Sequence, residues 1–326
     1  MNLTSSRAPL RAIGGNAGLF RIVLLLATLA LFAGLLSDFG SARNSYALLQ
    51  SFALLGLVTL GLSLTMLAGE FDLSVGSMVA VGGLITLKVG GGDNLWLGIS
   101  AAVGFAVLVG LFNALVFAWL RLSSLVITVG TMIALSGFAF WLADGRVVSI
   151  DNFDAGSLLD DQLLGVFSVR SLITFGAFLL VFGLLRYTRQ GRDILATGSH
   201  AHAAKASGVS TTRAYSWVFV LSSVFAALAG SLLSISLATA SATMGNNILL
   251  QAASAAIIGG IALAGGIGGV GGVLIGVLIL TALNNGLGLL GASAATILFA
   301  NGLVLLLVVL FDGQLGEWLK KMIRNR

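Results

Sequence analysis

The sequence predicts an all-α membrane protein, a bundle of about ten transmembrane helices with discontinuous helices among them and both chain ends in the cytoplasm. Of its 326 residues, 58% are hydrophobic and 9% are charged, and the mean hydropathy is +1.06. A soluble domain carries roughly 25% charged residues, so this chain has too few to cover a water-facing surface. There is no cysteine, which excludes a disulfide framework and a thiolate metal site.

Apolar runs of membrane-spanning length recur along the chain. A helix needs about 20 apolar residues to cross a hydrocarbon core about 30 Å thick. The expected crossings are Ile22–Leu36, Tyr46–Gly69, Leu73–Leu87, Leu95–Leu120, Leu122–Ala143, Ser171–Leu185, Ala214–Ala240, Ile248–Ala264, Ile267–Leu290 and Ala292–Phe311. Because glycine occurs 44 times and proline only once, we expect helix interruptions and close helix contacts at glycines.

The distribution of basic residues sets the orientation. Cytoplasmic segments of membrane proteins are enriched in lysine and arginine. If ten crossings start inside, the inside segments hold 13 of the 17 basic residues. These are Arg7, Arg11, Arg21, Arg121, Arg186, Arg189, Arg192, Lys205, Arg213, Lys320, Lys321, Arg324 and Arg326. The +5 net charge is therefore explained by membrane orientation, and we expect no nucleic-acid partner.

The sequence predicts one transmembrane domain, 1–326, made of two hydrophobic blocks. Ile22–Ala143 and Ser171–Phe311 each hold about five crossings, which invites the hypothesis of an inverted repeat. The expected connections are a cytoplasmic tail 1–20, an acidic outside loop 144–170, a cytoplasmic loop 187–213 and a cytoplasmic tail 312–326. We interpret the first apolar run as a retained anchor rather than a cleaved signal.

Two carboxylates interrupt the apolar pattern in the segment Gly69–Ser77. Ionised Glu70 and Asp72 would cost about 2.5–3.5 kcal/mol each at the bilayer centre. They must therefore lie at the cytoplasmic interface or in a discontinuous helix that faces protein or water. The simplest interpretation is that Asp72 caps a helix starting at Leu73; a transport role for Asp72 stays open.

The loop Tyr187–Arg213 is the longest polar segment on the predicted inside. It is either a basic connector that serves orientation or a docking surface for a cytoplasmic partner. The pair His200 and His202 has no third ligand nearby, so we expect no metal site.

Paired glycines dominate the segment Gly259–Gly272 near the end of the chain. Gly266-x-Gly268-x-x-Gly271 matches a dinucleotide fingerprint by chance, because no strand–helix unit surrounds it. The pairs, together with Gly272-x-x-x-Gly276, instead predict an unwound turn and a close helix crossing. Asn284 and Asn285 follow, and their amides need partners in protein or in a cavity.

Together these segments resemble the ribose-type permease subunits of bacterial ABC importers. That family carries a Gly-x-Ile-Asp-Leu-Ser-Val-Gly-Ser string, which Gly69–Ser77 matches with Phe71 in the Ile place. Its cytoplasmic loop is matched by the residues Gly191, Arg192, Ala196, Gly198, Ala203, Ala204, Ser207 and Gly208. Its later glycine pairs and Asn-Asn-Gly-Leu are matched by Gly259–Gly260, Gly265–Gly268 and Asn284–Leu287. The resemblance covers about Leu49–Leu310.

The chain departs from the family pattern at a few positions. His202 replaces a glutamate, and Ser199-His200 replace Gly-Asn, both within the cytoplasmic loop. Leu249 replaces an acidic residue, and Ile261-Ala262 replace Thr-Ser. These departures bear on the partner contact and on the solute.

The resemblance implies an importer of a sugar or sugar-like solute in the bacterial inner membrane, embedded in lipid. Its partners would be a cytoplasmic ATP-binding subunit, a periplasmic solute-binding protein and a second permease subunit. The sequence contains no Gly-x-x-x-x-Gly-Lys-Ser/Thr string, so ATP and Mg²⁺ are expected on the partner and no cofactor on this chain. We therefore expect a transport subunit without an ATPase site of its own.

The resemblance and the polar pattern together suggest two groups of site residues. The ATPase-coupling loop would use Gly191, Arg192, His202, Ala203, Ala204 and Gly208. A helix break or a polar translocation path would use Glu70, Asp72, Ser74, Asn113, Thr128, Asn284 and Asn285.

Three other function classes make different demands on the sequence. An ion-coupled transporter would use Glu70 and Asp72 as coupling carboxylates. An intramembrane enzyme is disfavoured because both histidines lie in an inside loop, and a passive channel because no filter motif is visible.

Overall fold

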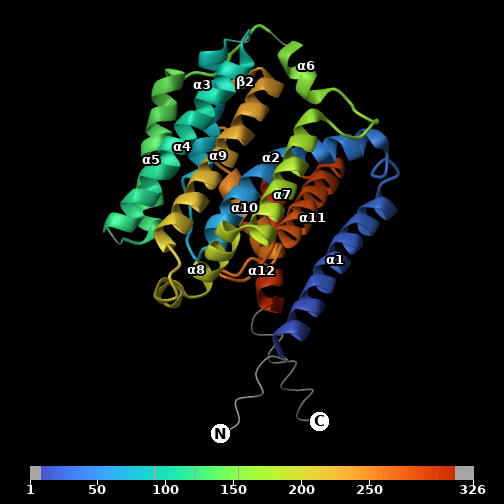
Figure 1. Cartoon of the computed structure of the whole chain (residues 1–326). Helices are drawn as coiled ribbons and strands as arrows, with labels where there is room; N and C mark the ends of the chain where they lie inside the picture. The colour runs from blue at the N-terminus through green and yellow to red at the C-terminus, as the bar shows by residue number, and fades with distance from the viewer. Residues whose placement is uncertain (1–8, 92, 121, 153, 313–326) are drawn as a thin grey trace, which may run out of the picture.

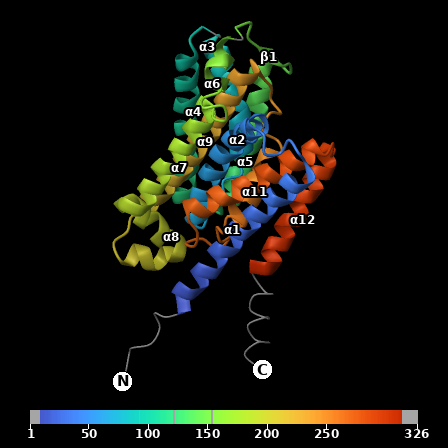
Figure 2. The ribbon, with the colours of Figure 1, turned by 90° about the vertical axis from the view of Figure 1, so that its right-hand side faces the viewer.

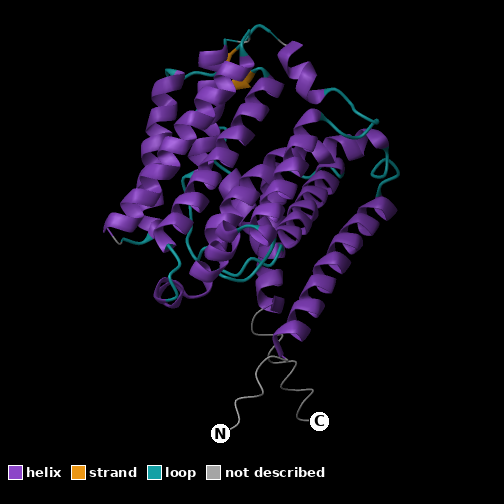
Figure 3. Ribbon diagram, viewed as in Figure 1, coloured by secondary structure: helices purple, strands orange, loops and turns teal. Residues whose placement is uncertain are grey.

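The protein is a bundle of helices, shown as a computed structural model in Figure 1. The structure describes residues 9–91, 93–120, 122–152 and 154–312. Within these residues the helices are α1 (Pro9–Leu35), α2 (Ala42–Leu67), α3 (Val75–Gly90), α4 (Leu95–Leu120), α5 (Ser124–Ala143), α6 (Asp154–Asp160), α7 (Val169–Tyr187), α8 (Arg189–Ala206), α9 (Thr211–Leu237), α10 (Ile248–Ile258), α11 (Val270–Leu289) and α12 (Ala294–Asp312). Two short strands, β1 (Val148–Ser149) and β2 (Thr239–Ala240), pair antiparallel at one end (Figure 3).

Among the residues that the structure describes, seven helices are long and apolar enough to cross a membrane: α1 from Gly18, α2, α4, α5, α7, α9 and α11. Three shorter apolar helices, α3, α10 and Ala294–Val308 of α12, accompany them. The predicted all-α, multi-span organisation is therefore confirmed. Each of the ten expected runs overlaps one of these helices.

Most helix boundaries differ from the expected ones by a few residues, and two differences are larger. α1 begins at Pro9, so part of the expected tail 1–20 is helical. α10 ends at Ile258 rather than Ala264, because Gly260 adopts a φ of +83°, which ends a right-handed helix. Arg7, Arg121 and the residues Lys320, Lys321, Arg324 and Arg326, which were used to orient the chain, lie outside the described residues.

The centre of the bundle is the pair α3 and α9, and α9 also contacts α2 and α4. Glycines allow the two backbones to touch. A Cβ at Gly82 would lie 2.7 Å from the Ala227 carbonyl oxygen, and one at Gly230 would overlap the Val79 carbonyl oxygen. Thr86 also donates a hydrogen bond of 2.7 Å to Ser231 across this contact. The short helix α3 is thereby enclosed by protein.

Helix α1 lies apart from the bundle and contacts mainly α11 (Figures 1 and 2). Only 6% of its apolar stretch Gly18–Leu35 is buried in the protein. The Phe32 ring is one point of attachment, because it packs directly on Gly286, where a Cβ would overlap the ring. The remaining side of α1 is therefore free to face lipid.

The two ends of the bundle differ in the elements that they carry. α8, the start of α1 and the end of α12 lie at one end, and α6 with the β1–β2 pair lies at the other (Figure 1). We call these the α8 end and the α6 end. The connection from α5 to α7 crosses the α6 end, and Ile150 donates a backbone hydrogen bond of 3.0 Å to Ala238 there.

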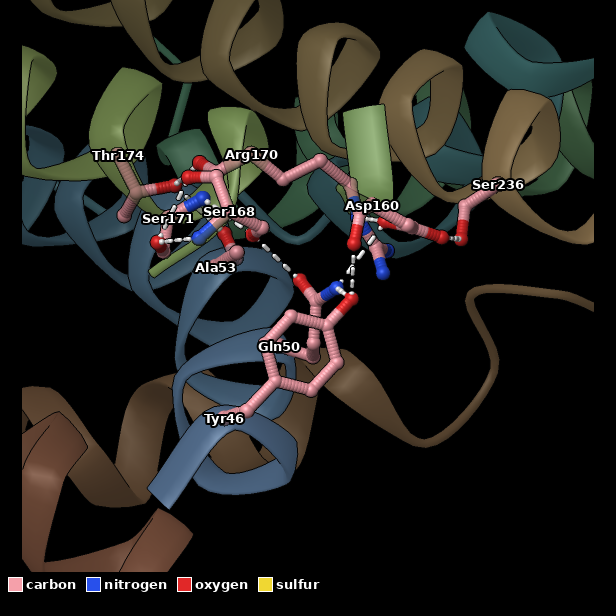
Figure 4. Close-up of polar contacts among 9 residues, drawn as sticks. All are labelled: Tyr46, Gln50, Ala53, Asp160, Ser168, Arg170, Ser171, Thr174 and Ser236. Atoms are coloured by element: carbon pink, nitrogen blue, oxygen red, sulfur yellow. Dashed lines mark hydrogen bonds and ion pairs between the residues drawn. The ribbon is translucent and has the colours of Figure 1, made fainter. Parts of the chain in front are cut away.

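Asp160, the last residue of α6, fastens this connection to three spans (Figure 4). Its carboxylate pairs with Arg170 of α7 at 2.6 Å and accepts hydrogen bonds from Gln50 of α2 at 3.1 Å and from Ser236 of α9. Its backbone carbonyl accepts a hydrogen bond from the Tyr46 hydroxyl of α2. Asp160 therefore joins α2 of the first block to α7 and α9 of the second.

The start of α7 belongs to the same network. Ser168 and Ser171 form a reciprocal capping box, and the Ser168 hydroxyl also donates to Gln50 at 2.8 Å. Thr174 donates to the Ala53 carbonyl of α2 at 3.0 Å (Figure 4). These bonds hold α2 and α7 together beneath Asp160.

The glycine contact between α3 and α9 can be tested by substitution. We expect Gly230→Ala to destabilise the protein by about 1–3 kcal/mol, because the added methyl group must displace the Val79 backbone. Gly104→Ala in α4 is the matched control, since a Cβ there meets nothing within 4 Å. Thermal unfolding in detergent would measure both. Equal melting temperatures for the two variants would contradict the close packing.

The Asp160 network predicts that one substitution will lower the stability of the protein strongly. Asp160→Asn should destabilise the protein by about 3 kcal/mol, because it leaves the charge of Arg170 buried without a counter-ion. Asp161→Asn makes the same chemical change at the next residue, which is exposed, and should have little effect. Chemical or thermal unfolding measures the stability of both variants. A similar loss of stability in both would show that the Asp160 network does not hold the connection to the three spans.

Candidate functional site

The first helix break lies between the end of α2 at Leu67 and the start of α3 at Val75. Gly69, with a φ of +83°, turns the chain out of α2. Glu70 is half-buried beside Ser124 of α5 and Tyr215 of α9, and Asp72 is fully buried. The carboxylates thus lie in a discontinuous segment that faces protein, one of the two placements that the sequence allowed.

Asp72 accepts hydrogen bonds from the residue two positions ahead of it. Its Oδ1 atom accepts from the Ser74 backbone N–H at 3.0 Å and from the Ser74 hydroxyl. This turn keeps residues 72–74 out of the helix, so α3 begins at Val75 rather than at Leu73. The N-cap of α3 is Ser74, which makes no side-chain cap hydrogen bond, so the expected capping role of Asp72 and the expected helix start at Leu73 were both wrong.

A chain of polar side chains extends from this turn into two neighbouring helices. The side-chain amide of Asn113 in α4 donates to the Ser74 hydroxyl at 3.4 Å. Thr131 of α5 donates to the side-chain oxygen of Asn113 at 2.6 Å. Thr128 of α5 donates to the Phe71 carbonyl at 3.3 Å. The structure therefore brings together four of the expected path residues, which are Asp72, Ser74, Asn113 and Thr128. All four are fully buried, so the cluster is closed in this conformation.

The second helix break spans residues 259–269, between α10 and α11. Gly260, Gly265, Gly266 and Gly268 all have positive φ values there. The helices on either side cross closely, since a Cβ at Gly276 would overlap the Ala255 carbonyl and lie 2.6 Å from the Gly259 nitrogen. The unwound turn and the close crossing predicted from the glycine pairs are both confirmed.

The two breaks meet each other against α8. The Gly266 N–H donates to the Leu67 carbonyl at 2.9 Å, which joins the second break to the end of α2. A Cβ at Gly198 of α8 would overlap the same Leu67 carbonyl and lie 2.8 Å from the Gly266 nitrogen. Backbone from three segments is therefore in contact at one point, which we call the glycine junction (Leu67–Gly69, Gly198–Ser199 and Gly265–Gly266).

The predicted loop 187–213 is mostly the helix α8, which kinks at His200 (φ −165°, ψ 93°). Of the expected coupling residues, Gly191 and Ala204 are buried. Gly191 packs on the end of α7, where a Cβ would lie 2.8 Å from the Leu185 carbonyl carbon. Arg192, His202, Ala203 and Gly208 are exposed. Only these four are available to a partner in this conformation.

Asn284 and Asn285 lie away from the polar cluster. Asn285 exchanges two hydrogen bonds of 2.9 Å with Asn44, which joins the last turns of α11 to the start of α2. The side-chain oxygen of Asn284 is buried without a hydrogen-bond partner in the described residues. The structure gives Asn285 a helix-pairing contact that the sequence did not reveal, because its partner lies 241 residues away.

Sequence reasoning also missed three hydroxyl residues of the cluster, Ser124, Thr131 and Ser222. Thr131 lies three residues after Thr128, on the same face of α5, and this spacing could have identified it. Ser222 of α9 lies against Asp72 and has no such signal. In the described part of the chain no group of three or more histidine, aspartate or glutamate side chains could hold a metal, and the rings of His200 and His202 are 6.5 Å apart.

Comparison with known proteins places this architecture among transport permeases. The family model for branched-chain amino acid transport system permease components matches residues 44–310. The arabinose transport permease AraH of Escherichia coli K12 is 33% identical over 277 residues, covering 84% of each chain. The ribose import permease RbsC of the same strain is 31% identical over 302 residues, covering 90% of this chain and 92% of RbsC.

A third relative transports a different compound. The autoinducer 2 import permease LsrC of Yersinia pseudotuberculosis is 34% identical over 316 residues, covering 93% of this chain and 87% of LsrC. No solved structure matches the chain. The resemblance to ribose-type permeases, which the three motifs suggested, is confirmed by these matches.

The Asp72 turn can be tested with a pair of variants. Asp72→Ala removes the acceptor of the Ser74 N–H and hydroxyl, and we expect a loss of about 1–3 kcal/mol. Asp72→Asn keeps an acceptor oxygen in the same place and should recover most of this loss. Thermal unfolding of the purified protein measures both. Equal destabilisation by Ala and Asn would show that the hydrogen bonds do not hold the turn.

Proposed function

The chain belongs to the family of branched-chain amino acid transport system permease components, and we propose that it is the membrane-spanning subunit of an ATP-driven importer for a sugar or sugar-like solute. The arabinose, ribose and autoinducer 2 permeases that it resembles over most of its length support this solute class. These relatives also favour an importer subunit over an ion-coupled transporter that uses Glu70 and Asp72.

The proposed topology has ten crossings with both ends in the cytoplasm of a bacterial inner membrane, embedded in lipid. Seven long apolar helices and the three shorter ones give this number. Arg189, Arg192 and Lys205 of α8 place positive charge at the α8 end, whereas the aspartates of residues 144–161 lie at the α6 end. This distribution supports a cytoplasmic α8 end.

An ATP-binding subunit would dock on α8, and ATP with Mg²⁺ would bind on that subunit. The single observation that carries the proposal is the glycine junction, because α8 contacts both helix breaks there through backbone atoms. Movement of α8 would reach both breaks without a flexible side chain in between. Arg192, His202, Ala203 and Gly208 are the exposed residues through which the partner would act.

Two further partners complete the proposed complex. A periplasmic solute-binding protein would deliver solute at the α6 end, where the connection 144–168 crosses the bundle. A second permease subunit, identical or related, would form the other half of the passage. The chain itself would perform no catalysis, in line with relatives that are permease components.

A charge on α8 should uncouple the complex without unfolding the chain. We expect Ala203→Glu to reduce ATP-driven uptake at least tenfold, because it places a bulky charge on the exposed face proposed to meet the ATP-binding subunit. Ala42→Glu, at an exposed position on the opposite end, is the matched control and should transport normally. Uptake by the whole complex in proteoliposomes with internal ATP is the measurement.

Co-purification tests the proposed ATP-binding partner directly. Mild-detergent extraction from the native host should recover an ATP-binding subunit with the parent chain and with Ala42→Glu, and less of it with Ala203→Glu. Normal uptake and normal recovery for Ala203→Glu would remove α8 as the docking site. Ion-driven uptake by the chain alone in vesicles would overturn the importer assignment.

A further inference from the structure

A non-helical segment, Ser241–Asn247, descends into the bundle between β2 and the start of α10. Its Gly245 packs on the first turn of α3. A Cβ at Gly76 would lie 3.1 Å from the Gly245 carbonyl oxygen, and a Cβ at Gly245 would overlap the Gly76 carbonyl oxygen. The segment and the start of α3 are therefore in direct backbone contact.

The depth of this contact follows from the length of α3. Gly76 lies 14 residues before Gly90, at the other end of α3. At 1.5 Å per residue this is about 21 Å along the helix axis. The hydrocarbon core is about 30 Å thick, so Gly245 lies well inside it. The segment starts at the α6 end, where β2 pairs with β1, and therefore runs from that end toward the middle of the membrane.

Three polar side chains of this segment are exposed at that depth: Thr243, Asn246 and Asn247. In the part of the chain that the structure describes, the side-chain amides of Asn246 and Asn247 make no hydrogen bond, and Asn247 does not cap α10 with its side chain. Unpaired amides and non-helical backbone do not face lipid, because hydrocarbon offers no hydrogen-bond partner. This surface therefore faces water or a polar solute.

The segment occupies a special position in the order of helices. α3 is the third helix of the first block, and α10 is the third span-like helix of the second block. Both are short, and each is preceded by non-helical chain, residues 68–74 and 241–247 respectively. Interrupted segments at corresponding positions of two halves mark the solute site in many transporters. Here the two interrupted crossings touch at Gly76 and Gly245.

We propose that Thr243, Asn246 and Asn247 line the solute passage opposite the first turn of α3, and that the passage takes a neutral, hydroxyl-rich solute. The solute class follows from the side chains, which donate and accept hydrogen bonds but carry no charge. The whole stretch Ala214–Phe311 lacks ionisable Asp, Glu, Lys, Arg and His, so an ionic solute would find no counter-charge there. This inference rests on the proposed transport function and names its path.

Single cysteines test the passage, because the chain contains no native cysteine. Thr243→Cys, Asn246→Cys and Asn247→Cys are treated in membranes with a charged, membrane-impermeant methanethiosulfonate reagent. Ile133→Cys is the control, since it is 64% exposed in the middle of the apolar helix α5 and should face lipid. We expect at least tenfold faster labelling at the three test positions than at position 133.

Labelling should also stop transport. In the complete complex, modification at position 246 or 247 should lower ATP-driven uptake of L-arabinose or D-ribose at least fivefold, whereas the treated Ile133→Cys protein should be unaffected. Test positions as unreactive as position 133 would mean a dry protein contact or lipid, and would overturn the proposal. Reactive positions with undiminished uptake would overturn it equally.

A second measurement separates a path role from a structural one. Asn246→Ala and Asn247→Ala should raise the KM for uptake severalfold with unchanged amounts of folded protein on gel filtration. A lower amount of folded protein with an unchanged KM would contradict the path. Because labelling needs no ATP and no partner, it also tells failure of this passage apart from failure of the importer assignment, which would abolish uptake by the parent complex.

Discussion

The close backbone contact between α3 and α9 is the constraint on which the rest of the structure depends. Gly82 lies against Ala227, and Gly230 lies against Val79, so the two helices approach without intervening side chains. A helix of 16 residues would be too short to stand alone in a bilayer of about 30 Å. Enclosure by α4, α5 and α9 surrounds the start of α3, the end that lies at membrane depth, with protein rather than lipid. The chain can therefore be interrupted at membrane depth without exposing backbone to lipid.

The enclosed break of residues 68–74 explains how carboxylates and hydroxyls are accommodated in a charge-poor bundle. Asp72 accepts hydrogen bonds from Ser74 through its Oδ1 atom, and Ser74 accepts one from Asn113, so these three buried groups are linked. At the end of α2 the same break presents backbone atoms without side chains between them and the neighbouring segments. These atoms contact Gly198 of α8 and Gly266 of the second break. A side chain at any of these contacts could change rotamer and absorb a displacement. Glycine has none, so a shift of α8 must move the ends of α2 and of the second break together.

The sequence predicted the spans well because apolar length and glycine pairs are local signals. The starts of α4 at Leu95 and of α10 at Ile248 were obtained directly, and the close approach of Gly276 to α10 followed from glycine spacing. Contacts between distant segments could not be predicted. Nothing local to Asn285 identifies Asn44 as its partner, and Asp160 was one aspartate among five in a loop read only as acidic. The segment 241–247 was assigned to no element, because its polar residues are few and its fold depends on the contact of Gly245 with Gly76.

The distribution of charge fits the proposed energy source in a partner subunit. A carrier driven by an ion gradient binds its ion with titratable or coordinating groups near the membrane midplane. Here the second block has no Asp, Glu, Lys, Arg or His between Ala214 and Phe311, and Asp72 is fully buried. What the bundle does have at its α8 end is a rigid backbone contact to both interrupted crossings. The segments that this contact can move, residues 68–74 and α10, adjoin the uncharged polar surface of Thr243, Asn246 and Asn247. Force applied to α8 would thus reach the walls of the passage through backbone alone, and a weakly binding passage without charges would release its solute once those walls move.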